Sequence, residues 1–355
     1  MWAIVQDAYG EADVLRLAEI ARPAVGAKEL LIQVHAAGLD RGTWHLMTGK
    51  PYLARLAFGI RAPRNPVPGF DVAGTVVEVG ASVTGFVAGD EVFGVGKGTF
   101  AEYAVAREGQ LALKPANLTF EQAAVVPISA STALQALVDQ GRVAAGQSVL
   151  VIGASGGVGS YAVQLAKAFG AEVTGVASDG KLDLVRSLGA DHVIDYTRED
   201  FADGVRRYDL VLDIAGNPTI SHLRRALTPT GTLVIVGGED GGNFSGGMNR
   251  PLRATAMSLF LRQRLRMFVA TTRHEGLERL TELIEAGKVM PSVDRAYPHW
   301  PRRRQPCATS CPARCEGRSR SPSERGEIIP GRLEPGPPAR HDPTGSARTP
   351  RRTVC

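Results

Sequence analysis

The feature that most constrains this chain is a glycine-rich turn between a predicted buried strand and a predicted helix. The apolar run from Val149 to Ile152 is typical of a parallel strand that is buried on both faces. The segment from Val158 to Phe169 carries apolar residues at helical spacing, and Gly170 is placed to end that helix. Such a turn lets backbone N–H groups approach a pyrophosphate at the start of the helix. Taken alone, it is equally consistent with a plain structural turn.

The sequence after the turn favours the dinucleotide site. It predicts further strands at 172–177, 192–194, 210–213 and 232–236, and a helix at 182–188. Strands that alternate with helices at this spacing predict an α/β domain with a parallel, doubly wound sheet. We expect the cofactor to contact the glycine turn and the glycines that follow the fourth and fifth strands, namely Gly153, Ala154, Ser155, Gly156, Gly157, Val158, Gly159, Gly216 and Gly237.

The turn also carries a family resemblance. The run from Gly146 to Lys167 resembles the signature of the zinc-independent quinone oxidoreductase and ζ-crystallin branch of the medium-chain dehydrogenase/reductases. The resemblance extends over residues 1–298, with further motifs at 68–80, 89–94, 100–103 and 188–196. It implies an α/β protein made of a GroES-like β-barrel catalytic lobe and a Rossmann cofactor domain.

The resemblance and the strand pattern together divide the chain. Residues 1–126 are expected to form most of the catalytic lobe, because short strands with turn signals predict a partly open barrel there. Residues 127–287 are expected to form the cofactor domain, whose last helix is predicted at 277–286, and residues 288–298 to return to the lobe. The substrate is expected to bind in the cleft between the two.

The end of the second strand of the cofactor domain decides between NADH and NADPH. A carboxylate there would bind the ribose 2′-hydroxyl of NAD, but the strand ends at Ala177. Ser178 and Lys181 can bind a 2′-phosphate instead, and the resemblance adds Tyr196. Asp179 opposes this choice, and Lys181 can also be interpreted as a solvated residue in the first turn of a helix. We expect NADPH as the cofactor.

The sequence argues against a catalytic metal. By the resemblance, zinc-dependent relatives bind the metal through two residues of the lobe and one at the domain junction, and the matching positions here are Asp40, Phe70 and Ile128. Phenylalanine and isoleucine have no atom that can bind zinc. Without a Lewis acid, alcohol oxidation is difficult, whereas reduction of a quinone or an activated C=C bond needs mainly positioning and hydride donation. We therefore expect no metal and a quinone or enone substrate.

Asp40, His45 and Tyr52 are the predicted catalytic residues, and Thr132 is expected to contact the cofactor from a helix at the junction. His45 can donate the proton that follows hydride delivery, because imidazole titrates near neutral pH. It can equally be a loop residue packed beside Trp44. Asp40, where the resemblance implies asparagine, is expected to position other groups by hydrogen bonding and not to act as a base.

Composition and charge exclude other classes of protein. The chain of 355 residues has a net charge of +5, but residues 1–298 have a net charge of −2 and residues 299–355 a net charge of +7. Nucleic-acid binding would rest on the tail alone, and we do not expect it. The apolar runs are too short to span a membrane and a strand begins near Trp2, so we expect a cytoplasmic protein without a signal peptide. The resemblance implies a homodimer.

Residues 299–355 differ from the rest of the chain. They are rich in Arg, Pro, Ser and Gly, contain only four Ile, Leu and Val residues, and are expected to be disordered. Cys307, Cys311 and Cys315 suggest a metal site, but no Cys-x-x-Cys pair or suitable fourth ligand accompanies them. A shifted reading frame from Pro298 onward can encode an alanine-rich helix, a glycine-containing turn and a closing strand like those of the family. We therefore interpret the tail as the product of a frameshift.

Together these features predict an NADPH-dependent, zinc-independent oxidoreductase that reduces small quinones or α,β-unsaturated carbonyls by hydride transfer. The alternatives are a non-catalytic NADPH-binding scaffold or structural protein, and an inactive product that lacks the end of its catalytic lobe. Turnover separates them, because a scaffold would bind NADPH without oxidising it.

Overall fold

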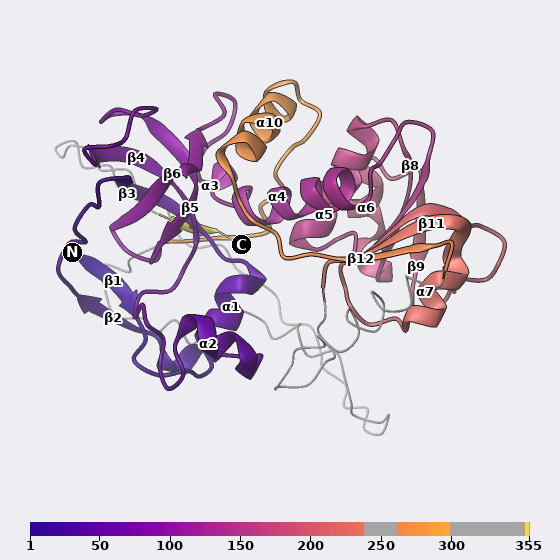
Figure 1. Ribbon diagram of the computed structural model, residues 1–355, viewed down its shortest axis with the longest axis horizontal. Helices are drawn as coiled ribbons and strands as arrows, with labels where there is room; N and C mark the ends of the chain where they lie inside the picture. The colour runs from indigo at the N-terminus through magenta and orange to yellow at the C-terminus, as the bar shows by residue number, and fades with distance from the viewer. Residues whose placement is uncertain (238–260, 299–351, 355) are drawn as a thin grey trace, which may run out of the picture.

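The computed structural model describes residues 1–237, 261–298 and 352–354, which form two lobes that lie side by side (Figure 1). One lobe is built around a β-barrel and the other around a six-stranded sheet. No helix in the described part of the chain is long and apolar enough to cross a membrane. The helices among the described residues are α1 (Arg41–Thr48), α2 (Arg55–Phe58), α3 (Phe120–Ala123), α4 (Pro127–Gln135), α5 (Gly157–Ala168), α6 (Leu182–Ser187), α7 (Ile220–Ala226) and α10 (His274–Glu285), with short turns of other helix types at Ala12–Val14, Tyr52–Ala54, Ala136–Gln140 and Asp179–Lys181.

The sheet of the cofactor domain is parallel throughout and has the strand order of a doubly wound fold, as predicted. Its central strand is buried on both faces: Val149 and Val151 pack into one apolar core, and Leu150 and Ile152 into another. This burial explains the continuous apolar run of that strand. In sheet order the strands are β12 (Arg264–Met267), β11 (Leu227–Ile235), β10 (Tyr208–Asp213), β7 (Ser148–Ile152), β8 (Glu172–Ala177) and β9 (His192–Asp195).

Helices cover both faces of this sheet. α5 and α6 pack into the same core as Val149, whereas α7 packs into the opposite core through Leu223. α10 buries Leu277, Leu280 and Ile284 along one face, which confirms the amphipathic helix predicted there, although it begins earlier, at His274.

The catalytic lobe is a β-barrel, as predicted, although its sheet is closed and the sequence predicted a partly open one. Its third strand pairs with β4 on one side and with β6 on the other, which closes the sheet on itself. Leu30, Ile32 and Val34 alternate along this strand and pack into the barrel core. The strands of this lobe are the hairpin β1 (Trp2–Val5) and β2 (Arg16–Glu19), and β3 (Glu29–Gly38), β4 (Asp71–Val79), β5 (Glu91–Lys97), β6 (Tyr103–Leu113), β13 (Ala296–Pro298) and β14 (Arg352–Val354).

The end of the chain differs from the expectation of a tail without regular structure. Arg352–Val354 form β14, which pairs in parallel with Ala36–Gly38 of β3 and antiparallel with β13. The expectation is therefore wrong for these three residues, because β3 offers unpaired backbone groups that even a short segment can use. Residues 299–351 and 355, with all four cysteines, lie outside the described residues, and the frameshift stays a prediction.

Hydrogen bonds join the two lobes near α10 and α4. The Asn117 side chain donates to the Ile284 carbonyl at 2.9 Å, and the Ala116 amide donates to Glu285 Oε1 at 2.9 Å. α4 begins at Pro127 and packs directly against α5. The junction thus fixes the barrel beside the edge of the sheet at which the glycine turn lies.

Candidate active site

The glycine turn between β7 and α5 has the geometry of an anion-binding loop. Gly153 has a φ of 87°, a conformation that favours glycine, and the amides of Gly153 and Ala154 both donate to the Val176 carbonyl, at 3.1 and 3.0 Å. α5 begins at Gly157, and the first amides of a helix have no acceptor within it. Gly156 and Gly157 are exposed, so a phosphate can reach these amides.

Close packing behind the turn requires glycine at one further position. A Cβ atom on Gly159 would overlap the Gly153 carbonyl oxygen and lie 2.8 Å from Ala154 Cα. α5 approaches the end of β7 this closely only because the side chain is missing. The structure thus brings the predicted residues of this loop together, namely Gly153, Ala154, Ser155, Gly156, Gly157, Val158 and Gly159, and their contact with a cofactor stays a prediction.

The ends of β8 and β9 bring together the residues predicted to select the cofactor. Tyr196 follows β9, and its amide donates to the carbonyl of Ala177, the last residue of β8, at 3.3 Å. Ser178 and Lys181 follow β8 directly. Lys181 is exposed and Tyr196 is 62% exposed, so both side chains are accessible to a ligand at this edge.

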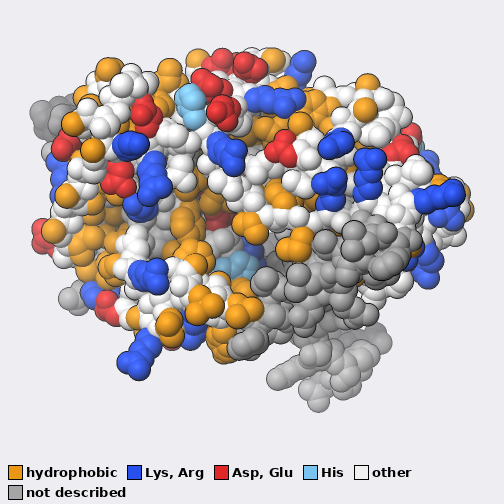
Figure 2. Space-filling model, in the orientation of Figure 1, with side chains coloured by type: hydrophobic (Ala, Val, Ile, Leu, Met, Phe, Trp, Pro, Cys, Tyr) orange, Lys and Arg blue, Asp and Glu red, His pale blue; other side chains and the backbone are white. Residues whose placement is uncertain are grey.

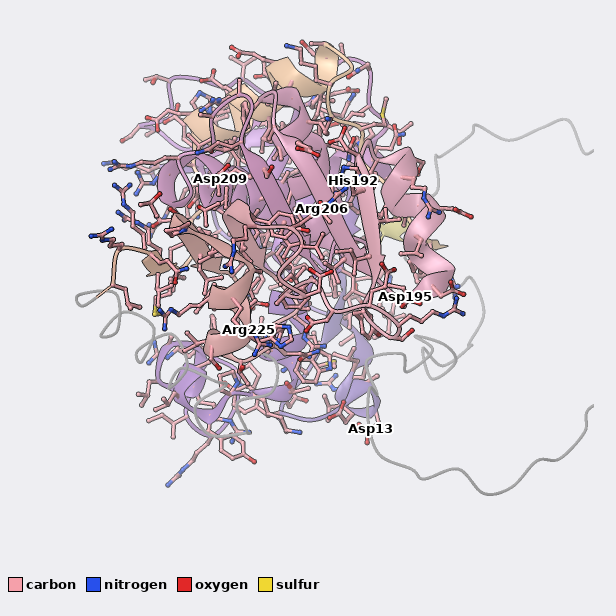
Figure 3. The ribbon with its side chains drawn as sticks, turned by 90° about the vertical axis from the view of Figure 1, so that its right-hand side faces the viewer. Asp13, His192, Asp195, Arg206, Asp209 and Arg225 are labelled. Atoms are coloured by element: carbon pink, nitrogen blue, oxygen red, sulfur yellow. The ribbon has the colours of Figure 1, made fainter. Side chains whose placement is uncertain are left out.

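Arg198 is a cation at this edge that the sequence analysis missed. Its guanidinium lies 3.9 Å from the Asp179 carboxylate and 3.5 Å from that of Asp195. Arg198 therefore offsets the charge of Asp179, the one acid that opposed a 2′-phosphate. In Figure 3, His192 and Asp195 mark the two ends of β9. The sequence signal that could have identified Arg198 was its position three residues after the end of β9, the strand that pairs with β8.

The remaining predicted cofactor residues lie at the same edge or against it. Gly216 has a φ of 76° and donates its amide to Asp213 Oδ1 at 3.1 Å, and the Gly237 amide donates to the Asp213 carbonyl at 3.2 Å. Because β10 and β11 are parallel to β7, their ends meet at the edge that carries the glycine turn. Thr132 lies on α4, is 9% exposed, and donates its hydroxyl to the Ile128 carbonyl at 2.7 Å.

The three predicted catalytic residues lie on one continuous segment of the barrel lobe. Asp40 caps α1, and its Oδ1 accepts from the Thr43 amide at 2.6 Å. His45 lies on α1, and its Nδ1 donates to the Lys50 carbonyl at 2.7 Å. Because a carbonyl only accepts, Nδ1 is the nitrogen that carries a proton in this hydrogen bond. Tyr52 begins the next turn of helix and is 41% exposed.

The surface is hollowed between the two lobes, and Figure 2 shows an acidic and a histidine side chain at depth in this hollow. His45 also packs edge-on against Trp44, with the ring centroids 5.1 Å apart. The packing role given above as the alternative for His45 is therefore present.

Asp71, the first residue of β4, is a buried acid that the sequence analysis missed. It is 1% exposed, and its Oδ1 accepts from the Ile128 amide at 3.1 Å. Burial, and then the charge of Asp40, raise the pKa of Asp71 well above its usual range. Burial also raises the pKa of Asp40, against the lowering effect of the hydrogen bond from Thr43. The sequence signal for this residue was an acid inside the motif at 68–80. A single sequence does not show that its side chain is buried.

Comparisons with known proteins agree with this geometry. Residues 26–116 match the alcohol dehydrogenase GroES-like domain, and residues 188–299 match the zinc-binding dehydrogenase family. A 2-methylene-furan-3-one reductase from Solanum lycopersicum is 36% identical over 303 residues, which cover 82% of this chain and 70% of that protein. A chloroplastic NADPH-dependent alkenal/one oxidoreductase from Arabidopsis thaliana is 38% identical over 311 residues, which cover 84% and 73% of the two chains.

Among solved structures, the quinone oxidoreductase from Coxiella burnetii superposes with a TM-score of 0.71 at 29% identity, covering 83% of this chain and 90% of that one. The chain belongs to the quinone oxidoreductase branch of the medium-chain dehydrogenase/reductase superfamily. This membership agrees with the resemblance found in the sequence.

The zinc positions of this superfamily do not fit a zinc ion here. The side chains of Phe70 and Ile128 have no atom that can bind a metal, and Ile128 uses its amide to donate to Asp71. The described residues contain no group of three or more His, Cys, Asp or Glu side chains placed to hold a metal. Zinc independence stays a prediction for a member of the quinone oxidoreductase branch.

Proposed function

We propose that this protein is an NADPH-dependent, zinc-independent oxidoreductase that reduces α,β-unsaturated carbonyls or quinones by hydride transfer. One observation carries the proposal. Where zinc-dependent members bind their metal, this chain has Asp40, Phe70 and Ile128, and the helix that Asp40 caps carries His45, which can donate a proton. Such a site is suited to protonating a reduced substrate and not to polarising an alcohol. The names of the relatives from Solanum and Arabidopsis support the same reaction class.

The cofactor edge supports NADPH. The glycine turn offers helix amides for the pyrophosphate, and Ser178, Lys181 and Tyr196 would hold the 2′-phosphate with help from Arg198. When bound, the reduced nicotinamide supplies the hydride. Gly216 and Gly237 leave room for the dinucleotide at the same edge, and Thr132 would contact it from α4.

The catalytic segment supplies the other groups. His45 Nε2 would donate the proton that completes the reduction, because Nδ1 is held by the Lys50 carbonyl. Asp40 would hold the start of α1 and so the position of His45, and the exposed Tyr52 would contact the substrate.

The proposed catalytic and cofactor roles also divide the chain into domains. Residues 1–126 and 288–298 would form the catalytic lobe, to which β13 and β14 add at β3, and residues 127–287 the cofactor domain. The protein would work on a small-molecule substrate, as a homodimer and in the cytoplasm, without nucleic-acid or membrane partners.

The proposal is tested by following the loss of NADPH absorbance with a panel of quinones, enones and simple alcohol–ketone pairs. We expect turnover with quinones or enones that a chelator leaves intact, and no stoichiometric zinc by elemental analysis. Cofactor binding without turnover by any quinone or enone would instead support a non-catalytic scaffold. Activity that a chelator abolishes and zinc restores would contradict zinc independence.

A further inference from the structure

A cavity lies between α7 and the beginnings of β11 and β12, on the side of the cofactor domain away from the barrel lobe (Figure 1). Its volume of about 370 Å³ falls in the range of roughly 300–1,000 Å³ that small-molecule sites occupy. The polar residues that line it are Ser221, Arg224, Arg225, Arg262 and Gln263, and none of its lining residues is acidic. We call it the arginine cavity.

The arginine cavity and the glycine turn lie at opposite edges of the parallel sheet. Arg262 and Gln263 directly precede β12, which begins at Arg264. The glycine turn instead follows Ile152 of β7, and this residue is level with Met267, the last residue of β12, through the pairings of the strands between them. The arginine cavity is therefore separate from the edge at which the cofactor is expected.

One guanidinium of the arginine cavity is held in place by its neighbours. Arg224 Nε donates to Gln263 Oε1 at 2.9 Å, and Gln263 Nε2 donates to the carbonyls of Arg224 and Thr228, at 3.1 and 3.3 Å. Both ends of the Gln263 amide are thus engaged, which fixes its orientation. The Nη groups of Arg224 make no hydrogen bond with any described residue, so they can donate to a ligand.

Two further cations of the arginine cavity have no acid bonded to them. Arg225 and Arg262 are exposed and form no ion pair within the part of the chain that the structure describes. Asp200 is the acid that faces Arg225, but its carboxylate already accepts from the Ala202 amide at 2.8 Å and lies 2.6 Å from His222 Nε2. The cavity therefore keeps an excess of positive charge.

A structural role accounts for only part of this arrangement. Arg224 and Arg225 are in the last turn of α7, where a cation stabilises the helix dipole. That role does not explain Arg262, which comes from another element, or the cavity that the three arginines share.

The donors of the arginine cavity fit a phosphate group. A phosphate monoester carries a charge of about −2 at neutral pH and has three acceptor oxygens, so that several guanidinium groups can bind it at once. Ser221 Oγ lies 3.1 Å from Thr219 Oγ1, and when Thr219 is the donor of that bond the Ser221 hydroxyl can donate to a ligand. Pro229 and Leu261 add an apolar wall, which suits the organic part of such a ligand.

We propose that the arginine cavity binds a small organic phosphate monoester. Arg224, Arg225 and Arg262 hold the phosphate group, and the apolar wall holds the organic part. This site goes beyond the proposed reduction, and its occupancy does not depend on turnover.

Isothermal titration calorimetry of the full chain tests the site, with phenyl phosphate as the probe. We expect one phenyl phosphate per chain, with the same affinity in the absence of NADPH and at saturating NADPH. It should bind more tightly than phthalate, which carries two carboxylates on the same ring, and more tightly than inorganic phosphate. Loss of binding at saturating NADPH would assign the phosphate to the cofactor edge and overturn the proposal.

Substitutions test which residues hold the phosphate. Arg225→Gln and Arg262→Gln should each weaken phenyl phosphate binding about tenfold or more, because each removes a charge-assisted hydrogen bond. Arg206→Gln is the matched control, because Arg206 is an exposed arginine of the same domain that does not line the cavity (Figure 3). It should change the affinity by less than about twofold, since solvent and salt screen an exposed charge at a distance.

Melting temperatures separate a loss of binding from a loss of fold. Arg225 and Arg262 are exposed, so both variants should melt with the wild type when no ligand is present. Phenyl phosphate should then raise the melting temperature of the wild type and not that of Arg262→Gln. The proposal would be overturned by the absence of binding to the wild type, by tighter binding of phthalate, or by an equal loss of affinity in Arg206→Gln and Arg262→Gln.

Discussion

Ala177 and Asp195 are opposite each other in the parallel pair of β8 and β9, and each is the last residue of its strand. Their pairing brings the loop after β8, with Ser178 and Lys181, beside the loop after β9, with Arg198. Two cations therefore lie at an edge where an NAD-specific domain would carry a carboxylate on the strand end.

This arrangement predicts a preference for NADPH over NADH. Lys181→Ala should weaken NADPH binding about tenfold or more and leave NADH binding unchanged, because it removes a charge-assisted hydrogen bond of roughly 1.5–3 kcal/mol. Arg198→Ala should have the same sign, since it removes a cation and exposes the charge of Asp179. Fluorescence titration measures both. Lys28→Ala, in the turn before β3, is a distant control, and equal affinity for the two cofactors in the wild type would refute the assignment.

His45 is predicted to donate the proton to the reduced substrate. His45→Gln should lower kcat/KM for an enone by about 100-fold, the lower end of the contribution from positioned proton transfer. His192→Gln is the matched control, because His192 is paired with Glu172 at 3.0 Å at the far end of β9. Steady-state kinetics with both variants measures this difference. If His45→Gln is as active as His192→Gln, His45 is not the proton donor and has a structural role, such as its packing against Trp44.

The two buried acids, Asp40 and Asp71, show which features of the site a single sequence does not reveal. The motif around Phe70 places Asp71 at the start of a strand, and the capping position of Asp40 follows from the helix pattern after it. Their burial and mutual repulsion depend on three elements that meet only in the folded chain, namely β3, β4 and α4.

Local pattern was sufficient for β8, which has the predicted bounds of Glu172–Ala177. β11 begins at Leu227, well before the predicted start at Thr232. The Thr-Pro-Thr-Gly stretch between these two residues has no periodic pattern of apolar side chains. It belongs to the strand because Leu227 pairs with Tyr208 of β10 in the folded chain.

The raised pKa of Asp71 predicts a pH dependence of stability. In the unfolded chain Asp71 titrates near its usual pKa, and in the folded chain it keeps its proton to higher pH. Between the two pKa values the folded state binds more protons, so the free energy of unfolding falls as pH rises, by about 1.4 kcal/mol for each pH unit between them. Asp71→Asn should reduce this fall, so that its stability relative to the wild type improves with rising pH. Thermal melts across the range measure it, and parallel curves for the two proteins would contradict the assignment.

The pairing of β14 with β3 predicts that the end of the chain contributes to stability. Deleting residues 352–355 should lower the free energy of unfolding by about 1–3 kcal/mol, because backbone hydrogen bonds at Ala36–Gly38 are lost. Deleting Cys355 alone is the control. A chain restored to the alternative reading frame should melt higher than either, since it would supply a longer closing strand. An unchanged melting temperature after the deletion would show that the β14 pairing contributes no stability.

The most direct test of the whole account is the transfer of label from cofactor to substrate. With NADPH deuterated at the transferring position of the nicotinamide and an enone substrate, the account predicts one deuterium on the β carbon of the product and a solvent-derived hydrogen on the α carbon. Mass spectrometry and proton NMR of the isolated product read both positions. A product without cofactor deuterium, or no product while NADPH is bound, would contradict hydride transfer by this protein.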